Sequence, residues 1–350
     1  MGVTGNPSIS TAQERRLLEQ ASTGDEDAFR RLVEPYHAEL HAHCYRMLGS
    51  VHDAEDALQD VLLRAWRGLR RFEGRSSLRS WLYRIATNAC LDMAARRPKR
   101  VLPLDYGPPG DPHDGPAAPL SESVWLEPYA DERLGLEARL AAPEARYEQR
   151  EAVELAFVAA LQHLPPKQRA ALILREVLGF SAQEAAEALA TTVPSVKSAL
   201  QRARKAVNER LPKQTQQATL RSLGDERIQE LVDAYIDAWE RDDVDAVVAM
   251  LTKDATIAMP PTPTWYRGRE AIATFYAEWA LSGELSWRHV PARANGQPAV
   301  ACYAWDASKE TYVARVLDVL TLRGARIAEI TAFADPDVFR RFGLPGELPS

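Results

Sequence analysis

Cysteine is scarce in this chain of 350 residues, which contains only Cys44, Cys90 and Cys302 and no CxxC pair. Three widely spaced cysteines do not make a disulfide framework, so we expect a reducing compartment, the cytoplasm. The sequence has no run of about 18 apolar residues, the length that a membrane span needs. Its N-terminus lacks a basic start followed by an apolar core. We therefore expect no membrane span, no signal peptide and no membrane partner.

Signatures of several enzyme classes are also missing. The sequence has no glycine-rich phosphate loop and no Ser-His-Asp signature. His37 and His41 stand four residues apart, a spacing that can bind zinc, but no carboxylate completes a ligand set. We therefore expect neither a metal nor a cofactor.

Charge, by contrast, is plentiful and is separated along the chain. The net charge is −6, yet residues 60–100 carry 11 basic and 3 acidic side chains. Residues 101–150 carry 4 basic and 10 acidic side chains, and residues 222–350 carry 13 and 20. A basic segment in an acidic protein favours local contact with a polyanion. A solvated, arginine-rich helix face would have the same composition, so composition alone leaves both interpretations open.

Apolar spacing and proline content divide most of the chain into three parts. Residues 10–98 have helical periodicity throughout and predict an all-α bundle. Residues 99–147 predict a linker, because eight prolines fall between residues 101 and 150. Its apolar island, Trp125–Tyr129, is a candidate for docking on a neighbouring domain. Residues 148–212 predict short helices followed by a longer basic helix, which is the helix-turn-helix pattern.

The last part, residues 222–345, has a different pattern. Helical periodicity in residues 225–249 and 268–280 precedes four strand-like runs, at residues 287–294, 299–305, 311–322 and 327–333. Helices followed by an antiparallel meander predict an α+β domain that is large enough to hold its own core.

Two stretches resemble the sigma-70 family. Asp53–Trp66 with Leu78–Asn88 is similar to region 2 of the extracytoplasmic-function (ECF) sigma factors, and Leu164–Leu172 through Ser195–Arg204 is similar to region 4. The last part resembles the SnoaL-like, NTF2-related cone fold. The resemblance implies a multidomain protein: a region 2 helical bundle and a region 4 helix-turn-helix, both all-α, followed by a C-terminal α+β cone.

The resemblance implies that the chain binds core RNA polymerase, through the β′ coiled coil and the β flap, and directs transcription from promoter DNA. Asp56, Gln59 and Asp60 share one helix face by their spacing, and in the family this face binds the β′ coiled coil. Two carboxylates and an amide suit a basic partner surface. Acidic residues near a helix start can also simply favour the helix dipole.

The basic helix of region 2 and the loop before it are the −10 contacts that the resemblance implies. Arginines can neutralise phosphates, an aromatic ring can stack on a flipped base, and Asn88 or Ser76 can bond the edge of that base. Trp81 and Phe72 are each open to a second interpretation, as core residues. The expected −10 residues are Phe72, Arg75, Ser76, Arg79, Arg84, Asn88, Arg96 and Arg97.

The second helix of the helix-turn-helix is the expected reader of the −35 element. Residues 193–212 include five basic side chains and one acidic side chain. Arg and Gln can read purine edges, whereas Ser and Lys more often hold phosphate. The expected exposed residues are Ser195, Lys197, Ser198, Gln201, Arg202 and Lys205, and the expected inward residues are Val196, Leu200, Ala203 and Val207.

The start of the last part, Ala234–Pro260, resembles ketosteroid isomerase and its relatives, in which an aspartate base stands just before the proline. Met259 occupies that place here, and a thioether cannot accept a proton, so we expect no catalysis by that route. An apolar cone that binds a small ligand and an ordinary domain core both remain open. The possible pocket residues are Tyr235, Met259, Trp265, Trp279 and Asp318.

Regulation in cis is expected because the acidic tail is tethered close to two basic segments. The tail could inhibit, or it could clamp the active state, and a separate anti-sigma factor is left open. Phe333, Phe339, Phe342 and the Trp125–Tyr129 island are candidates for apolar contact. The alternative function is an NTF2-like ligand-binding or enzymatic domain fused to a DNA-binding regulator, for example a ligand-controlled repressor.

Overall fold

The computed structural model describes residues 11–120, 124–134, 151–212 and 214–349, and it divides them into two compact units. Unit 1 holds the described residues up to Lys99, residues 132–134 and Ala160–Arg210. Unit 2 holds the described residues of Arg100–Asp131, residues 151–159 and the chain from Leu211 onward.

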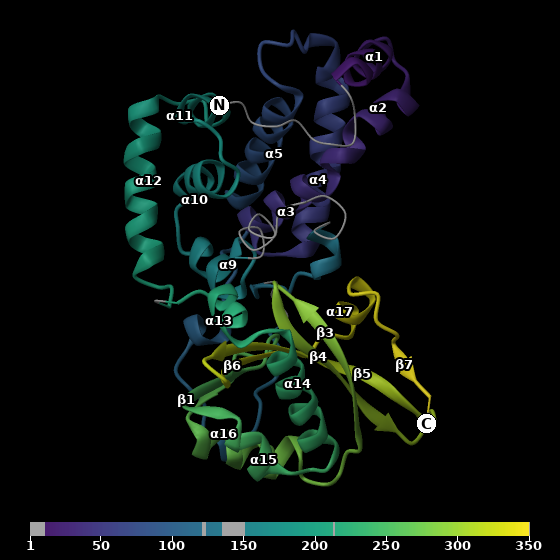
Figure 1. Ribbon diagram of the computed structural model, residues 1–350, viewed down its shortest axis with the longest axis vertical. Helices are drawn as coiled ribbons and strands as arrows, with labels where there is room; N and C mark the ends of the chain where they lie inside the picture. Colours follow the sequence, from purple (N-terminus) through teal and green to yellow (C-terminus); the bar gives the residue numbers. More distant parts are fainter. Residues whose placement is uncertain (1–10, 121–123, 135–150, 213, 350) are drawn as a thin grey trace. The chain divides into compact units, whose positions relative to one another are not determined.

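Unit 1 begins with a bundle of helices (Figure 1), and side chains cap the start of several of them. Ser50 accepts a hydrogen bond from the Asp53 N–H, and Ser77 accepts one from the Ser80 N–H. Gly49 ends the third helix in the left-handed conformation. The helices are α1 Thr11–Ser22, α2 Glu26–Val33, α3 His37–Leu48, α4 Val51–Gly68 and α5 Leu78–Ala94, with short turns η1 Glu34–Tyr36 and η2 Leu69–Arg71.

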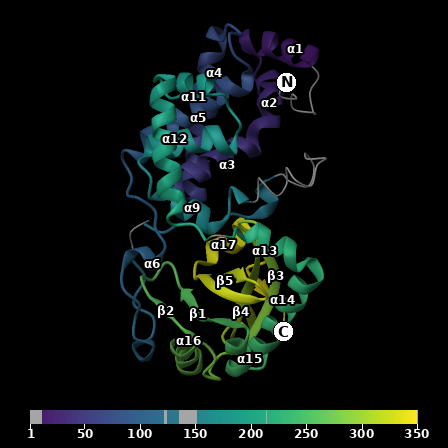
Figure 2. The same cartoon turned by 60° about the vertical axis from the view of Figure 1, so that its left-hand side comes forward.

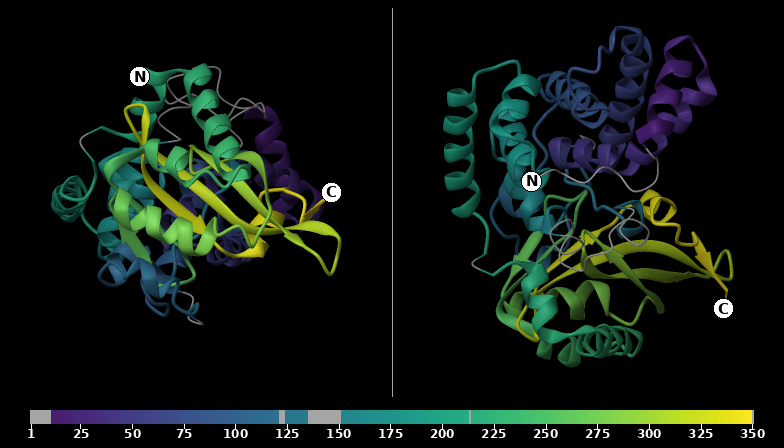
Figure 3. Two further views of the ribbon diagram at one scale, coloured as in Figure 1. Left: turned by 90° about the horizontal axis from the view of Figure 1, so that it is seen from below. Right: turned by 45° about the horizontal axis from the view of Figure 1, so that its top comes forward.

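The helix-turn-helix of unit 1 is formed by α11 and α12. Ser181 and Glu184 form a capping box at the start of α11, and Thr192 caps α12. The basic helix α12 packs on α10 and α11, and its outer side faces away from them (Figures 1 and 3). The helices of this part of the chain are α9 Leu155–Gln162, which begins in unit 2, α10 Pro166–Leu172 with the π-helical turn η5 Ile173–Val177, α11 Ala182–Ala188 and α12 Val193–Asn208.

Unit 2 contains the α+β tail, in which a sheet of order β2-β1-β6-β5-β4-β3, with β7 beside β5, packs against helices. Tyr235, Tyr276 and Leu320 are among the fully buried side chains of its core. The strands are β1 Leu251–Ala258, β2 Trp265–Arg267, β3 Trp287–Ala294, β4 Gln297–Asp306, β5 Thr311–Arg323, β6 Arg326–Phe333 and β7 Glu347–Leu348. The helices are α13 Gln216–Leu223, α14 Asp225–Glu240, α15 Val244–Ala249, α16 Arg269–Phe275 with the π-helical turn η6 Tyr276–Ala280, and α17 Pro336–Arg341.

The four strand-like runs form the expected antiparallel meander as β3, β4, β5 and β6, and an additional strand makes the whole sheet mixed. Strand β1, which the sequence pattern missed, pairs in parallel with β6 and places Ile257 opposite Ile330. The predicted helix over residues 225–249 is in fact two helices. Asp242 adopts a positive φ of 53° between them, and the Asp243 side chain caps α15.

Residues 100–131, predicted as a linker, lie along the tail in unit 2, and we call their described part the strap. The first half of the strap binds β2 and the loop before it. The Trp265 Nε1–H donates to the Gly107 carbonyl at 2.8 Å, and the Gly110 N–H donates to the Trp265 carbonyl at 2.9 Å. The Leu120 N–H donates to the Pro261 carbonyl at 3.0 Å. Figure 2 shows this segment, with its short helix α6 Pro103–Tyr106, beside β2.

The end of the strap binds the turn between β3 and β4. The Tyr129 N–H donates to Asn295 Oδ1, and the Asn295 N–H donates to the Tyr129 carbonyl, each at 2.8 Å. The Gly296 N–H donates to Asp131 Oδ1 at 2.7 Å. Trp125 and Leu126 are buried as well, so the predicted docking of the Trp125–Tyr129 island is confirmed.

Residues just before α9 are also bound to the tail. The Asn295 Nδ2–H donates to the Val153 carbonyl at 2.7 Å, and the Leu155 N–H donates to Gln297 Oε1 at 3.0 Å. The Glu154 carboxylate accepts from the Gln217 N–H at 2.6 Å. The tail therefore binds the chain on both sides of residues 132–152.

Substitution of Gly115 tests whether the strap packs on the tail as the structure shows. Its φ of 68° and ψ of −174° are essentially restricted to glycine, and an added Cβ would lie 2.6 Å from the Trp279 ring. We expect Gly115→Ala to lower the free energy of unfolding by about 1–3 kcal/mol. Gly107→Ala is the matched control, because Gly107 has extended backbone and open space around it. Equal losses of unfolding free energy in the two variants, measured by chemical denaturation, would contradict this packing.

Candidate nucleic-acid interface

The outer face of α12 is polar and basic, and its inner face is apolar. Residues Val196, Leu200, Ala203 and Val207 are buried, so the predicted division of the helix is confirmed. The residues expected on the outside, Ser195, Lys197, Ser198, Gln201, Arg202 and Lys205, are all exposed. A helix anchored by one apolar face and presenting the other has the geometry of a major-groove reader.

Two contacts orient side chains along α12. The Arg202 Nη1–H donates to Ser198 Oγ at 2.7 Å, one turn back on the same helix. Arg204 forms an ion pair with Glu176 of η5. The sequence analysis did not include Arg204, which is exposed, among the expected DNA contacts.

The residues expected at the −10 element lie on or near α5, but they differ in access. Arg75, Arg84, Asn88 and Arg96 are exposed, and Phe72 and Ser76 are half-buried. Trp81 is 7% exposed, and its ring centroid lies 5.1 Å from that of Phe72. Trp81 is therefore a core residue, which was one of its two interpretations, and Phe72 packs on it.

Ion pairs link the acidic face of α4 to basic residues. Asp56 and Asp60 each have 43% of the side chain exposed, and Gln59 is exposed. Asp60 pairs with Arg64 at 2.7 Å, and Asp56 pairs with Arg97 at 3.3 Å. Arg97 was expected at DNA, yet it also pairs with the buried Asp53. Exposed pairs contribute only about 0–1 kcal/mol each, so a charged partner can replace them.

Region 4 covers part of α5 within unit 1. The Arg79 guanidinium lies 4.9 Å from the ring centroid of Tyr83 and 5.1 Å from that of Phe180, and it pairs with Glu39. The Ser80 Oγ–H donates to Glu184 Oε1 of α11 at 3.1 Å. Of the expected −10 residues, Arg79 is therefore in contact with region 4.

A buried arginine makes a second contact between the two regions. Arg169 donates to the carbonyl of Met47, near the C-terminal end of α3, and to Gln162 Oε1 at 2.5 Å. The carbonyls at a helix end favour a cation. Burial lowers the pKa of Arg169 to about 10, so the side chain remains charged at neutral pH. The Gln162 Nε2–H donates to the Arg46 carbonyl at 3.1 Å.

The tail has a buried polar cluster in its interior. The Tyr235 Oη–H donates to Asp318 Oδ2 at 2.9 Å, and Cys302 Sγ lies 3.6 Å from the same oxygen. Burial raises the pKa of Asp318 to about 6. Burial, and then the Asp318 charge, raise the pKa of Tyr235. Met259 is 7% exposed and belongs to the adjoining apolar core.

The other two expected pocket residues lie against the strap. Trp265 binds Gly107, as described above, and the Trp279 Nε1–H donates to the Pro112 carbonyl at 3.1 Å. Trp279 is 45% exposed. The five expected pocket residues therefore divide between the interior and the strap.

In the described part of the chain, no helix combines the length and apolar character that a membrane crossing requires.

Comparison with known proteins agrees with this arrangement. Residues 32–100 match Sigma-70 region 2, residues 154–207 match Sigma-70 region 4, and residues 232–330 match the SnoaL-like domain. The ECF RNA polymerase sigma factor SigG of Mycobacterium tuberculosis is 40% identical over 99% of this chain and 94% of its own length. SigW of Bacillus subtilis is 29% identical over 56% of this chain and 96% of its own length.

A solved structure shares the fold. The M. tuberculosis ECF sigma factor SigJ matches with a TM-score of 0.56 and 22% sequence identity, over 89% of this chain and all of that one. The chain belongs to the ECF subgroup of the sigma-70 family and carries a SnoaL-like tail. Proteins of this class are polymerase subunits and not enzymes.

The buried Asp318 predicts a pH-dependent stability of the tail. Its pKa is about 6 in the folded protein against an ordinary value of 3.8, so the folded state favours the protonated carboxyl. The contribution of Asp318 is complete below about pH 4 and is lost as the pH rises through 6, by about 3 kcal/mol. Denaturation of Asp318→Asn between pH 4 and 7.5 should lack this loss. The exposed control Asp245→Asn should keep it, and identical pH profiles in all three proteins would contradict the prediction.

Proposed function

We propose that the chain directs promoter-specific initiation by bacterial core RNA polymerase in the cytoplasm, with −10 melting by region 2 and −35 recognition by region 4. The exposed basic face of α12, held by an apolar face on the rest of the helix-turn-helix, is the observation that carries this proposal. The relatives named as ECF sigma factors support it.

Core polymerase and DNA would meet different surfaces. Asp56, Gln59 and Asp60 would bind the β′ coiled coil, since their partly exposed charges suit a basic surface. Region 4 would contact the β flap while α12 enters the major groove. The polymerase surface would compete with Arg97 and Arg64 for the same carboxylates, which would free Arg97 for phosphate.

Region 4 would have to leave α5 before the −10 element binds there. Phe180 and Glu184 contact Arg79 and Ser80, which lie beside the expected −10 residues. One cation–π contact and one hydrogen bond each contribute on the order of 1 kcal/mol. Arg169 adds a buried contact, so opening would need the free energy of polymerase binding.

The tail would regulate in cis by limiting how far regions 2 and 4 can separate. The strap is bound to the tail from Gly107 onward, and the chain is bound to the tail again at Val153–Leu155. Short chain segments therefore connect the bound residues to region 2 and to region 4. This tether would serve in place of a separate anti-sigma protein.

The alternative of an NTF2-like enzyme joined to a DNA-binding regulator is not favoured, because the sigma factor relatives span both helical regions. The interior of the tail is a second candidate site, for a small ligand to which Tyr235 and Asp318 would supply the polar groups.

Substitutions on the acidic face of α4 and on the basic face of α12 should separate polymerase binding from −35 recognition. We expect Asp56→Lys with Asp60→Lys to weaken binding to core polymerase about tenfold or more, because like charges would then face the partner. Arg202→Ala should cost about 1–3 kcal/mol of −35 discrimination and leave core binding unchanged. The control Asp245→Lys, on the tail, should affect neither. Affinity capture of core enzyme and promoter-specific run-off transcription measure the two effects, and the same defect in both variants would refute the division.

The tether can be loosened without altering backbone conformation. Asn295 has a positive φ of 55°, so Asn295→Gly removes both side-chain bonds and retains a permitted backbone. We expect it to raise promoter-specific transcription several-fold at equal protein concentration. Glu310→Gly is the matched control, with a φ of 52° in an exposed turn. Unchanged transcription would refute regulation through this tether, and reduced transcription would make the tail an active-state clamp.

A further inference from the structure

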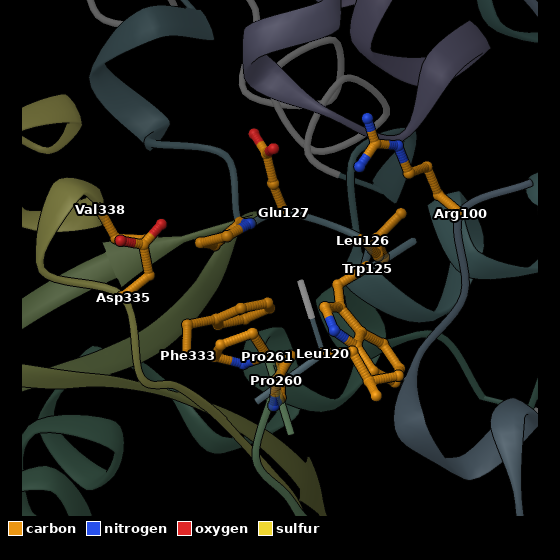
Figure 4. A pocket seen from close by; sticks show the side chains of 11 residues that line it. Arg100, Leu120, Trp125, Leu126, Glu127, Pro260, Pro261, Phe333, Asp335 and Val338 are labelled. Atoms are coloured by element: carbon orange, nitrogen blue, oxygen red, sulfur yellow. The ribbon is translucent and has the colours of Figure 1, made fainter. Parts of the chain in front are cut away.

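The strap and the tail line a partly open pocket of about 200 Å³ (Figure 4). The Trp125 indole stands on one side of this pocket and the Phe333 ring on the opposite side, with Pro260 and Pro261 between them. Leu126 of the strap and Val338 of α17 complete the apolar lining. None of the buried cluster around Asp318 lines this pocket, so it is separate from the interior of the tail.

The charged residues around the pocket balance one another. Glu127, Asp335 and Arg100 line it. Arg341 pairs with Glu127 at 3.1 Å and approaches Asp335 at 3.9 Å. Two carboxylates and two guanidinium groups leave no net charge, so a charged ligand would lose its hydration without gaining a matching counter-charge. The pocket therefore favours an uncharged ligand.

A hydrogen-bond donor is available in the wall. Trp125 is 6% exposed, and its Nε1–H has no hydrogen-bond partner among the described residues. The indoles of Trp265 and Trp279, which also contact the strap, both donate to backbone carbonyls. A buried donor without an acceptor costs about 1–3 kcal/mol, so an acceptor on a ligand would relieve that cost.

The volume sets the size of the ligand. An apolar cavity of about 150 Å³ is known to hold one benzene molecule. The space between Trp125 and Phe333 therefore suits one ring with a small substituent.

We propose that this pocket binds a small, uncharged, single-ring molecule whose oxygen accepts a hydrogen bond from Trp125 Nε1. Such a ligand contacts Leu126 and Trp125 of the strap together with Pro261 and Phe333 of the tail. It therefore stabilises the docked strap, because it binds only when both walls are present. This inference concerns unit 2 alone and does not rest on the proposed sigma function.

Isothermal titration of the full chain with acetophenone tests the proposal. Acetophenone is an uncharged ring with one carbonyl acceptor, and we expect saturable binding together with a rise in the Tm. Toluene lacks the acceptor and should bind about three- to tenfold more weakly, the range for one hydrogen bond. Benzoate and benzylammonium should bind at least about tenfold more weakly, because each brings an unmatched charge. Tightest binding by either ion would overturn the assignment of an uncharged ligand.

Two pocket variants and a control locate the binding. Trp125→Phe retains the apolar wall and should weaken acetophenone binding three- to tenfold, with toluene binding unchanged. Its unfolding without ligand should remain cooperative, which separates a loss of binding from a loss of folding. Val338→Phe fills the pocket and should abolish binding while unfolding remains cooperative. Trp305→Phe, whose ring contacts Tyr312 outside the pocket, should bind as wild type. Absence of acetophenone binding, or equal affinity in all variants, would overturn the proposal.

Discussion

The side-chain amide of Asn295 joins three parts of the chain that are far apart in sequence. It accepts from Tyr129 at the end of the strap and donates to Val153 before region 4, while its own backbone forms the turn between β3 and β4. Buried amides of this kind are costly unless both ends are satisfied, and here both are. Together with the bonds of Gly296 to Asp131 and of Gln297 to Leu155, this amide attaches both segments to the tail.

Unit 1 also contains contacts between residues that are expected to bind partners. Residues that could meet polymerase or DNA, such as Asp56 and Arg97, bind each other in the free chain. These exposed contacts are weak and can be exchanged for a partner. The Arg169 contact is different, because it is buried and joins the guanidinium to the Met47 carbonyl of the other helical region. Under the proposed function, the free energy for separating the two regions would come from the contact with core polymerase.

Sequence reasoning succeeded where the signal was local. The exposed and buried residues of α12 follow from helical periodicity over four turns, and strand β3 follows from a short run bounded by turns. The docking of the Trp125–Tyr129 island also followed, because an apolar cluster in a proline-rich segment needs something to bury it.

The misses were long-range. The parallel pairing of β1 with β6 joins residues more than 70 positions apart, and no local pattern encodes it. The packing of Phe180 on Arg79 and the binding of Arg169 to the end of α3 depend on how two helical regions meet. Exposure of a single arginine, and therefore its access to DNA, cannot be predicted before such contacts are known.

Hydrogen–deuterium exchange of the full chain, free of polymerase, tests most directly whether the tail holds the strap. In the structure the Leu126 N–H donates to the Val101 carbonyl, and the Tyr129 N–H donates to Asn295. We predict that peptides covering residues 124–131 exchange at least roughly a hundredfold more slowly than an unstructured chain, about 2.8 kcal/mol of opening free energy. Exchange at the rate of an unstructured peptide would contradict the account, because the strap would then be free of the tail.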